Sequence, residues 1–108
     1  MAQQYLIEKG LIYIQRNFRS KMGEIDLIMQ DTNTLVFVEV RYRKNTFFGE
    51  AVETVDRRKQ IKLIRTAEYY LAYHEKYAKM PCRFDVVGLH GHENQAIEFN
   101  WIKNAFEH

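Results

Sequence analysis

The feature that most constrains the fold is a pair of β-rich runs, residues 24–29 and 35–42, on either side of the polar segment 31–34. The short side chains of that segment, Asp-Thr-Asn-Thr, favour a tight turn. We therefore predict an antiparallel β-hairpin. If the turn is centred in the middle of the segment, Asp26 lies directly opposite Glu39.

This register predicts two hairpin faces of different character, because successive side chains of a strand point to opposite sides of the sheet. One face gathers the charged residues Glu24, Asp26, Glu39 and Arg41, with Glu24 opposite Arg41. The other is plain apolar core and contains Ile25, Leu27, Val36, Val38 and Val40.

Two carboxylates opposite each other repel unless something neutralises them. The predicted pair of Asp26 and Glu39 would either share a proton or bind a hard divalent cation, for which Mg²⁺ or Mn²⁺ is the expected ion. A second interpretation pairs Glu39 with Arg41, Arg16 or Arg19 in a surface charge network. A register slip of one residue would also place the two acids on opposite faces.

The rest of the chain predicts an α/β fold of order αβββαβ, ending in a last strand or a short helix. Residues 2–9 are typical of the last turns of a helix with Gly10 as its C-cap, and we expect the chain to begin within that helix. Further strands are expected at residues 11–19, covered on both faces, and at 82–89 and 96–101. We expect a mixed sheet flanked by helices.

A second helix is predicted from about residue 57 to residue 79, with Asp56 as its N-cap. In this helix Gln60 shares an otherwise apolar stripe with Ile64, Ala67 and Leu71. Gln60 therefore either reaches the acidic face of the hairpin or is a buried amide satisfied by backbone groups. Asp85, within the strand at 82–89, either joins the site or forms an internal salt bridge with an arginine.

The composition sets limits on the class of protein. The 108 residues, 46% of them hydrophobic, suffice for one core, and we expect a single domain over residues 1–108. No apolar run approaches the roughly 20 residues of a membrane-spanning helix, and the first residues lack the layout of a signal peptide. We expect a cytoplasmic protein that does not associate with a membrane.

The charge is unevenly distributed. The whole chain has a net charge of only +2, but the segment 41–65 holds eight Lys/Arg against three Asp/Glu. Such a cluster indicates either phosphate contacts or a solvated helix face. The residues expected to contact nucleic acid are Arg43, Lys44, Arg58, Lys59 and Lys62.

Five segments in this order, GEIDLI, LVFVEVRYR, FFGEAVETVDRRKQ, CRFDVV and WIKNAF, resemble the bacterial YraN family. This is an uncharacterised group with a restriction-endonuclease-like, PD-(D/E)XK fold that is similar to Holliday-junction resolvases. The resemblance covers almost the whole chain. It implies that Asp26 is the motif's Asp, Glu39 its second acid and Arg41 its lysine, and that Gln60 matches a helix glutamine near such sites.

The sequence departs from the family pattern at two places. The family's first helix begins further upstream and carries a glutamate that points towards the site, and this chain lacks that acid. Arg41 stands in place of lysine, and because arginine stays protonated it can stabilise phosphate oxygens but not act as a base.

The expected function is that of a metal-dependent endonuclease-like protein that acts on or binds DNA, with branched or single-stranded DNA as candidate substrates. Asp26, Glu39 and the Val40 carbonyl would hold the Mg²⁺ or Mn²⁺ ion, and Arg41 would stabilise the charged transition state. The alternatives are an inactive nucleic-acid-binding module and a protein-interaction module with a vestigial site. A homodimer is expected by analogy with junction-cleaving nucleases.

Overall fold

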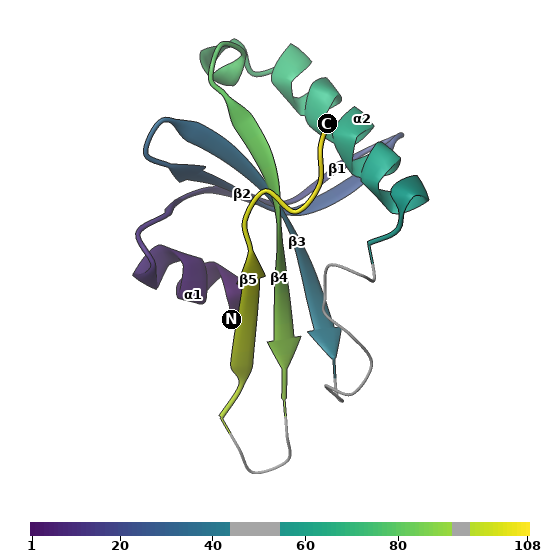
Figure 1. Ribbon diagram of the computed structural model, residues 1–108. Helices are drawn as coiled ribbons and strands as arrows, with labels where there is room; N and C mark the ends of the chain where they lie inside the picture. The colour runs from purple at the N-terminus through teal and green to yellow at the C-terminus, as the bar shows by residue number, and fades with distance from the viewer. Residues whose placement is uncertain (44–54, 92–95) are drawn as a thin grey trace.

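In the computed structural model, which describes residues 1–43, 55–91 and 96–108, five strands form one mixed sheet (Figure 1). The elements are α1 (Ala2–Glu8), β1 (Ile12–Ser20), β2 (Gly23–Asp31), β3 (Thr34–Arg43), α2 (Arg57–Ala72), a 3₁₀ turn (Glu75–Tyr77), β4 (Cys82–His90) and β5 (Glu98–Ile102). The strands lie in sequence order, with β3 and β4 parallel and the other neighbours antiparallel. The expected α/β class with a mixed sheet is confirmed.

The hairpin forms in the predicted register. Asp31 pairs with Thr34 and Ile28 with Phe37, so the turn is centred where the polar segment indicated. The paired register ends at Leu27 and Val38. Asp26 and Glu39, which were predicted to pair directly, lie just beyond this point and are not paired in the ladder.

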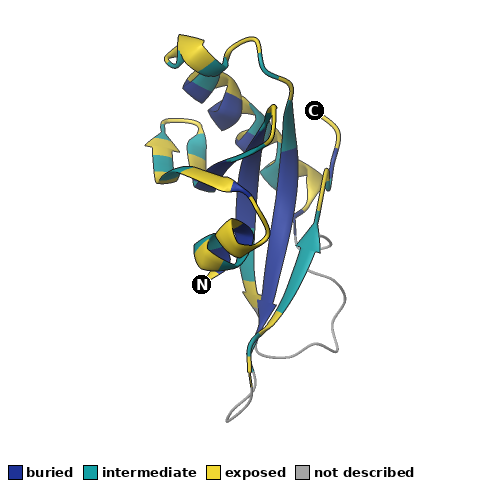
Figure 2. Cartoon of the chain, turned by 90° about the vertical axis from the view of Figure 1, so that its left-hand side faces the viewer, coloured by how far each residue is buried: buried dark blue, intermediate teal, exposed yellow. Residues whose placement is uncertain are grey.

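The two helices cover opposite faces of the sheet (Figure 1). The face under α2 is built from a cluster that includes Ile28, Leu35, Phe37, Leu63, Ala67, Tyr70, Phe84 and Val86. The face under α1 includes Ala2, Leu6, Leu27, Met29, Val36, Val38, Val87 and Leu89. Figure 2 shows the resulting gradient, with buried strands at the centre of the sheet and exposed residues at its margin.

The N-terminal helix ends as its glycine indicated. Gly10 has a φ of +101°, a left-handed conformation that glycine adopts without steric cost. Its N–H donates to the Ile7 carbonyl, and the Leu11 N–H donates to the Leu6 carbonyl, each at 3.0 Å. These two bonds satisfy carbonyls that the helix end leaves without a partner.

Two expectations about the edges of the fold were wrong. The strand predicted at residues 11–19 was expected to be covered on both faces, but β1 is an edge strand with mostly exposed or half-buried residues. The helix predicted to reach residue 79 ends at Ala72. His74 contributes to this early end, because its backbone leaves the helical region and its ring stacks on Tyr70 with the ring centroids 3.8 Å apart.

The buried face of α2 is also rotated from the predicted stripe. Its buried residues are Leu63, Thr66, Ala67 and Tyr70, whereas Gln60 is only half-buried at the margin of this face. Ala67 is therefore the one member of the predicted stripe that is fully buried. No helix among the described residues has the length and apolar character required to cross a membrane.

Asp85 belongs to the core and not to the site, as the salt-bridge interpretation held. Its side chain is fully buried and accepts hydrogen bonds from Arg83 Nε at 3.0 Å, Trp101 Nε1 at 2.9 Å and the Asn104 N–H at 2.9 Å. Arg83 also contacts the more exposed Asp31 at 2.9 Å. The network ties β4 to β5 and to the hairpin turn.

We predict that Asp85→Asn lowers the free energy of unfolding by about 3–5 kcal/mol, because it removes the charge of the fully buried member of the network and leaves the half-buried Arg83 with Asp31 alone. Asp31→Asn removes the other carboxylate of the same arginine at a half-buried position, and we expect a loss of about 1 kcal/mol or less. Urea unfolding of both variants measures the difference. Equal losses would mean that burial does not govern this network.

Candidate functional site

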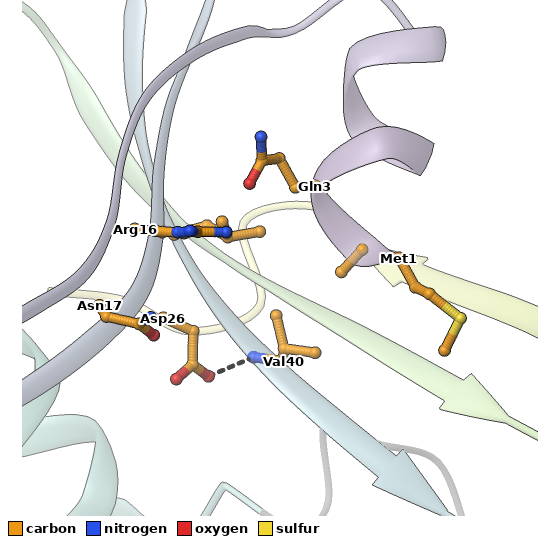
Figure 3. A pocket seen from close by; sticks show the side chains of 8 residues that line it. Met1, Gln3, Arg16, Asn17, Asp26 and Val40 are labelled. Atoms are coloured by element: carbon orange, nitrogen blue, oxygen red, sulfur yellow. Dashed lines mark hydrogen bonds between the residues drawn. The ribbon is translucent and has the colours of Figure 1, made fainter.

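Asp26 lies where the β2–β3 ladder ends, and its side chain joins the two strands. The Val40 N–H donates to Asp26 Oδ2 at 2.8 Å, so a carboxylate takes the place that a backbone carbonyl would have in a continuing ladder (Figure 3). Val40 was expected to offer its carbonyl to a metal. In the structure, the Val40 N–H donates to the Asp26 carboxylate.

The alternation of β2 breaks at Asp26. Ile25 packs into the cluster under α2 together with Ile28, three positions away, although side chains on one face of a strand are an even number of positions apart. The prediction that Ile25 faces the same side as Leu27 was therefore wrong. Beside the break, Asn17 of β1 has a φ of +53° between the pairs Arg16–Leu27 and Phe18–Ile25. Such irregularities re-aim side chains next to functional sites.

Glu39 is buried, with 5% of its surface exposed, and lies on the α2 side of the sheet. Its Oε2 atom is 3.0 Å from Arg41 NH2 and 3.6 Å from Lys59 Nζ. A hydrogen bond between the side chains of Glu39 and Asp26 brings the two acids together. The site thus combines two acids from the hairpin with one basic residue from β3 and one from α2.

Burial raises the pKa of Glu39 to about 7, with the charge of Asp26 and the hydrogen bond to Asp26 adding to the rise. The charges of Lys59 and Arg41 act in the opposite direction. Glu39 therefore exchanges its proton near neutral pH. Perturbed carboxyl groups of this kind are frequent at functional sites, although structural ion-pair networks also produce them.

Two of the expected hairpin interactions differ in the structure. Glu24 was expected opposite Arg41, but its carboxylate lies 3.0 Å from Arg19 Nε at the exposed edge of the sheet. The interpretation that paired Glu39 with Arg41 is correct for this contact. The same interpretation placed this contact in a surface charge network, and that part was wrong, because Glu39 is buried.

Gln60 does not reach the acids. Its Nε2 donates to the Val55 carbonyl at 3.0 Å, and its Oε1 accepts from Arg57 at 3.2 Å. The alternative of a buried amide satisfied by backbone groups is correct only for the bond to the Val55 carbonyl, because Gln60 is half-buried and its other partner is a side chain. The helix residue that reaches Glu39 is the preceding one, Lys59, whose own N–H donates to the N-cap Asp56 at 2.8 Å.

Two of the other residues predicted to contact nucleic acid are described in full, and both lie on α2. Arg58 and Lys62 are exposed on α2. Lys44 and the side chain of Arg43 lie outside the described residues. Lys59, also predicted to contact nucleic acid, has its Nζ 3.6 Å from Glu39 Oε2.

The sequence interpretation missed the role of β1. Arg16 and Asn17 line a cavity beside Asp26, and Arg16 had been considered only as a partner of Glu39 (Figure 3). One signal was available: asparagine is disfavoured within strands, and Asn17 interrupts the apolar residues of β1. Asparagine also adopts a positive φ more readily than most residues, as Asn17 does here.

The site's donor set suits a hard cation that retains water. Among the described residues no group of three or more His, Cys, Asp or Glu side chains gathers as a metal site. Mg²⁺, however, is commonly bound through one or two carboxylates together with substrate phosphates. Asp26 and Glu39 supply such a pair, with Arg41 and Lys59 in contact with Glu39.

The first prediction for the site concerns the pKa of Glu39. Asp26→Asn should lower it from about 7, because the neighbouring negative charge is lost, while burial keeps it above its ordinary value. Lys59→Met should raise it, because a stabilising cation is lost. A carboxyl-¹³C NMR titration measures both shifts, with Glu68→Gln on the exposed side of α2 as the control. A wild-type Glu39 that titrates near 4.5 would contradict the geometry.

The second prediction concerns stability and pH. Because the native pKa of Glu39 is raised above 4.5, the native state binds a proton that the unfolded state has released. The free energy of unfolding therefore falls as pH rises from 4.5 to about 7, by at most about 1.4 kcal/mol per pH unit from this group. Glu39→Gln cannot titrate, so its stability relative to wild type should increase across this window.

Urea unfolding at several pH values tests this difference. The control variant Glu68→Gln removes an exposed carboxyl of α2 and reports how pH acts on the rest of the molecule. A wild-type stability that runs parallel to that of Glu39→Gln would show that Glu39 does not hold an extra proton.

Comparison with known sequences places the chain in a family. A UPF0102 protein of Stutzerimonas stutzeri (strain A1501) is 51% identical over 107 residues, which cover 99% of this chain and 88% of that protein. UPF0102 proteins of Alcanivorax borkumensis and Pseudomonas syringae pv. syringae are each 47% identical, over 97% and 98% of this chain and 84% and 86% of theirs. Residues 1–89 match the family model itself. The chain belongs to the uncharacterised protein family UPF0102.

Proposed function

We propose that this chain is a metal-dependent endonuclease with a restriction-endonuclease-like fold, acting on branched, flapped or single-stranded DNA. The observation that carries the proposal is the burial of Glu39 beside Asp26, at the point where two strands separate. A protein that needed these acids only for stability would gain little from burying them together, because each raises the cost of charging the other. The proposed oligomeric state is a homodimer, by analogy with junction-cleaving nucleases.

Asp26 and Glu39 would hold Mg²⁺ or Mn²⁺, with the Val40 carbonyl as a third oxygen ligand. When bound, such an ion supplies Lewis-acid chemistry, because it lowers the pKa of a water molecule and neutralises charge on a phosphate. The hydrogen bond from the Val40 N–H fixes the Asp26 carboxylate for this task. The proton held by Glu39 near neutral pH must leave before the carboxylate can bind a cation.

Arg41 would bind and orient a phosphate oxygen. Its NH2 atom is committed to Glu39 at 3.0 Å, but its Nε is buried and has no partner among the described residues. A buried donor without an acceptor is costly, and a phosphate oxygen would satisfy it. As an arginine it remains charged, so its role is to stabilise charge and not to transfer protons.

Lys59 would take the part that the motif's lysine has in related nucleases, as a positive charge beside the acids. It comes from α2, whereas the motif position on β3 holds Arg41. With both cations present, the site has two positive charges near the phosphate, although the position on β3 holds an arginine and not a lysine. Arg41 supplies its charge from the sheet, and Lys59 supplies its charge from α2.

A second candidate is a nucleic-acid-binding module without turnover. It is favoured by the two ion pairs that Arg41 and Lys59 make with Glu39, because such pairs can neutralise the acid without any metal. The cleavage experiment below separates the two candidates. Binding that weakens with salt, at about −0.9 in log-log slope per phosphate contact on duplex DNA, without any cleavage would favour this second function.

We predict that the full chain cleaves flapped or single-stranded DNA with Mg²⁺ or Mn²⁺ and that EDTA abolishes the activity. Asp26→Asn and Glu39→Gln should each lower the rate by more than the roughly 10- to 100-fold that is typical of changes around the ligands of a metal. Gel analysis of end-labelled DNA measures this. Glu68→Gln, which removes an exposed carboxyl of α2, should retain full activity.

One outcome of the same assay would contradict the proposed function. Cleavage that survives both Asp26→Asn and Glu39→Gln would come from another site or from a contaminating nuclease. The proposal would then fail, whatever the metal dependence. Circular dichroism of each variant excludes loss of the fold as the cause of a lost rate.

A further inference from the structure

A cavity of about 380 Å³ lies between the start of α1 and the β1–β2 strands (Figure 3). Its polar lining comes from Gln3, Arg16, Asn17 and Asp26, and Leu27 and Val40 add apolar surface. The volume falls at the lower end of the range for small-ligand sites, which combine apolar walls with a few polar groups. The cavity is on the α1 face of the sheet, whereas Lys59 and Glu39 meet on the α2 face.

Asp26 belongs to both the cavity and the acid pair. Its carboxylate lines the cavity, accepts the Val40 N–H and interacts with Glu39. A ligand in the cavity would therefore lie directly beside the carboxylates. This position distinguishes the cavity from the exposed basic residues of α2, which lie on the other face.

Arg16 is the cationic side chain of this cavity, and it takes part in none of the ion pairs among the described residues. Its guanidinium offers the planar set of donors that binds phosphate oxygens in pairs. Next to it, Asn17 has a φ of +53° between two regularly paired residues of β1, Arg16 and Phe18. Gln3 adds a third polar side chain from α1.

The carboxylate of Asp26 on the same wall disfavours a bare anion, because like charges repel. A phosphate accompanied by a divalent cation avoids this repulsion. The lining thus fits a nucleotide better than an isolated acidic group, with Arg16 on the phosphate and the apolar wall of Leu27 and Val40 on the sugar or base.

We propose that this cavity is the subsite for the nucleotide next to the cleaved phosphodiester, with Arg16 binding its phosphate. The inference rests on the proposed function and adds to it the direction from which the strand enters. That direction is the α1 face, and not the basic flank of α2 that the charge distribution indicated.

The test follows binding without relying on cleavage. Deoxythymidine 5′-monophosphate with Mg²⁺ should shift the backbone amide NMR signals of Asn17, Leu27 and Val40, and the shifts should be smaller in EDTA. Arg16→Ala should weaken this binding by about 10- to 100-fold, the loss expected for a charge-assisted hydrogen bond. Arg65→Ala, an exposed charge of α2, is the matched control and should change it far less.

A labelled single-stranded oligonucleotide in the same conditions distinguishes a strand from a free nucleotide. It should bind more tightly than the mononucleotide, because further phosphates add contacts, and it should lose affinity in Arg16→Ala. Signals that shift only on α2, equal losses in Arg16→Ala and Arg65→Ala, or a mononucleotide that binds more tightly than the strand would each overturn the subsite.

The failure of this inference can be told apart from that of the nuclease. Nucleotide binding that depends on Arg16, in a protein that does not cleave DNA, supports the subsite and rejects the catalytic function. Cleavage that depends on Asp26 and Glu39 but not on Arg16 supports the nuclease and rejects the subsite. Arg16 is exposed, so its replacement is not expected to unfold the chain.

Discussion

The hydrogen bond between the Val40 N–H and the Asp26 carboxylate joins β2 and β3 beyond the end of their backbone ladder. It lies where the hairpin ladder ends, between the core under α1 and the core under α2. Because a side chain rather than a backbone carbonyl accepts this N–H, β2 and β3 stay joined while their backbones separate. The separation makes room for Glu39 on one side and for the cavity on the other.

Electrostatics then decide the state of the acids. Two carboxylates in a partly buried place must be compensated by a proton or by cations, and this protein provides both kinds of compensation. Arg41 is fixed by its position on β3, whereas Lys59 depends on how α2 is docked. The charge of the site is therefore coupled to the packing of Leu63 and Tyr70 beneath that helix.

The register of the hairpin could be predicted because a short polar turn and two-residue periodicity suffice to set which residues face each other. The break at Asp26 could not, because Ile25 is apolar on either face and periodicity does not reveal where a side chain replaces a ladder bond. The end of α2 was missed for a similar reason, since neither glycine nor proline marks Ala72. Lys59 was recognised as basic, but which α2 residue reaches Glu39 depends on the rotation of the helix, and this is set by tertiary packing.

The irregular backbone of β1 has a consequence beyond the site. An exposed edge strand is a template on which the strand of another molecule can add, and this is a common route to aggregation. β1 carries a register shift between Tyr13 and Gln15 and a left-handed Asn17, which interrupt the regular row of donors and acceptors that such an addition needs. The distortion that shapes the surroundings of Asp26 thus also keeps the long outer strand of the sheet from recruiting neighbouring chains.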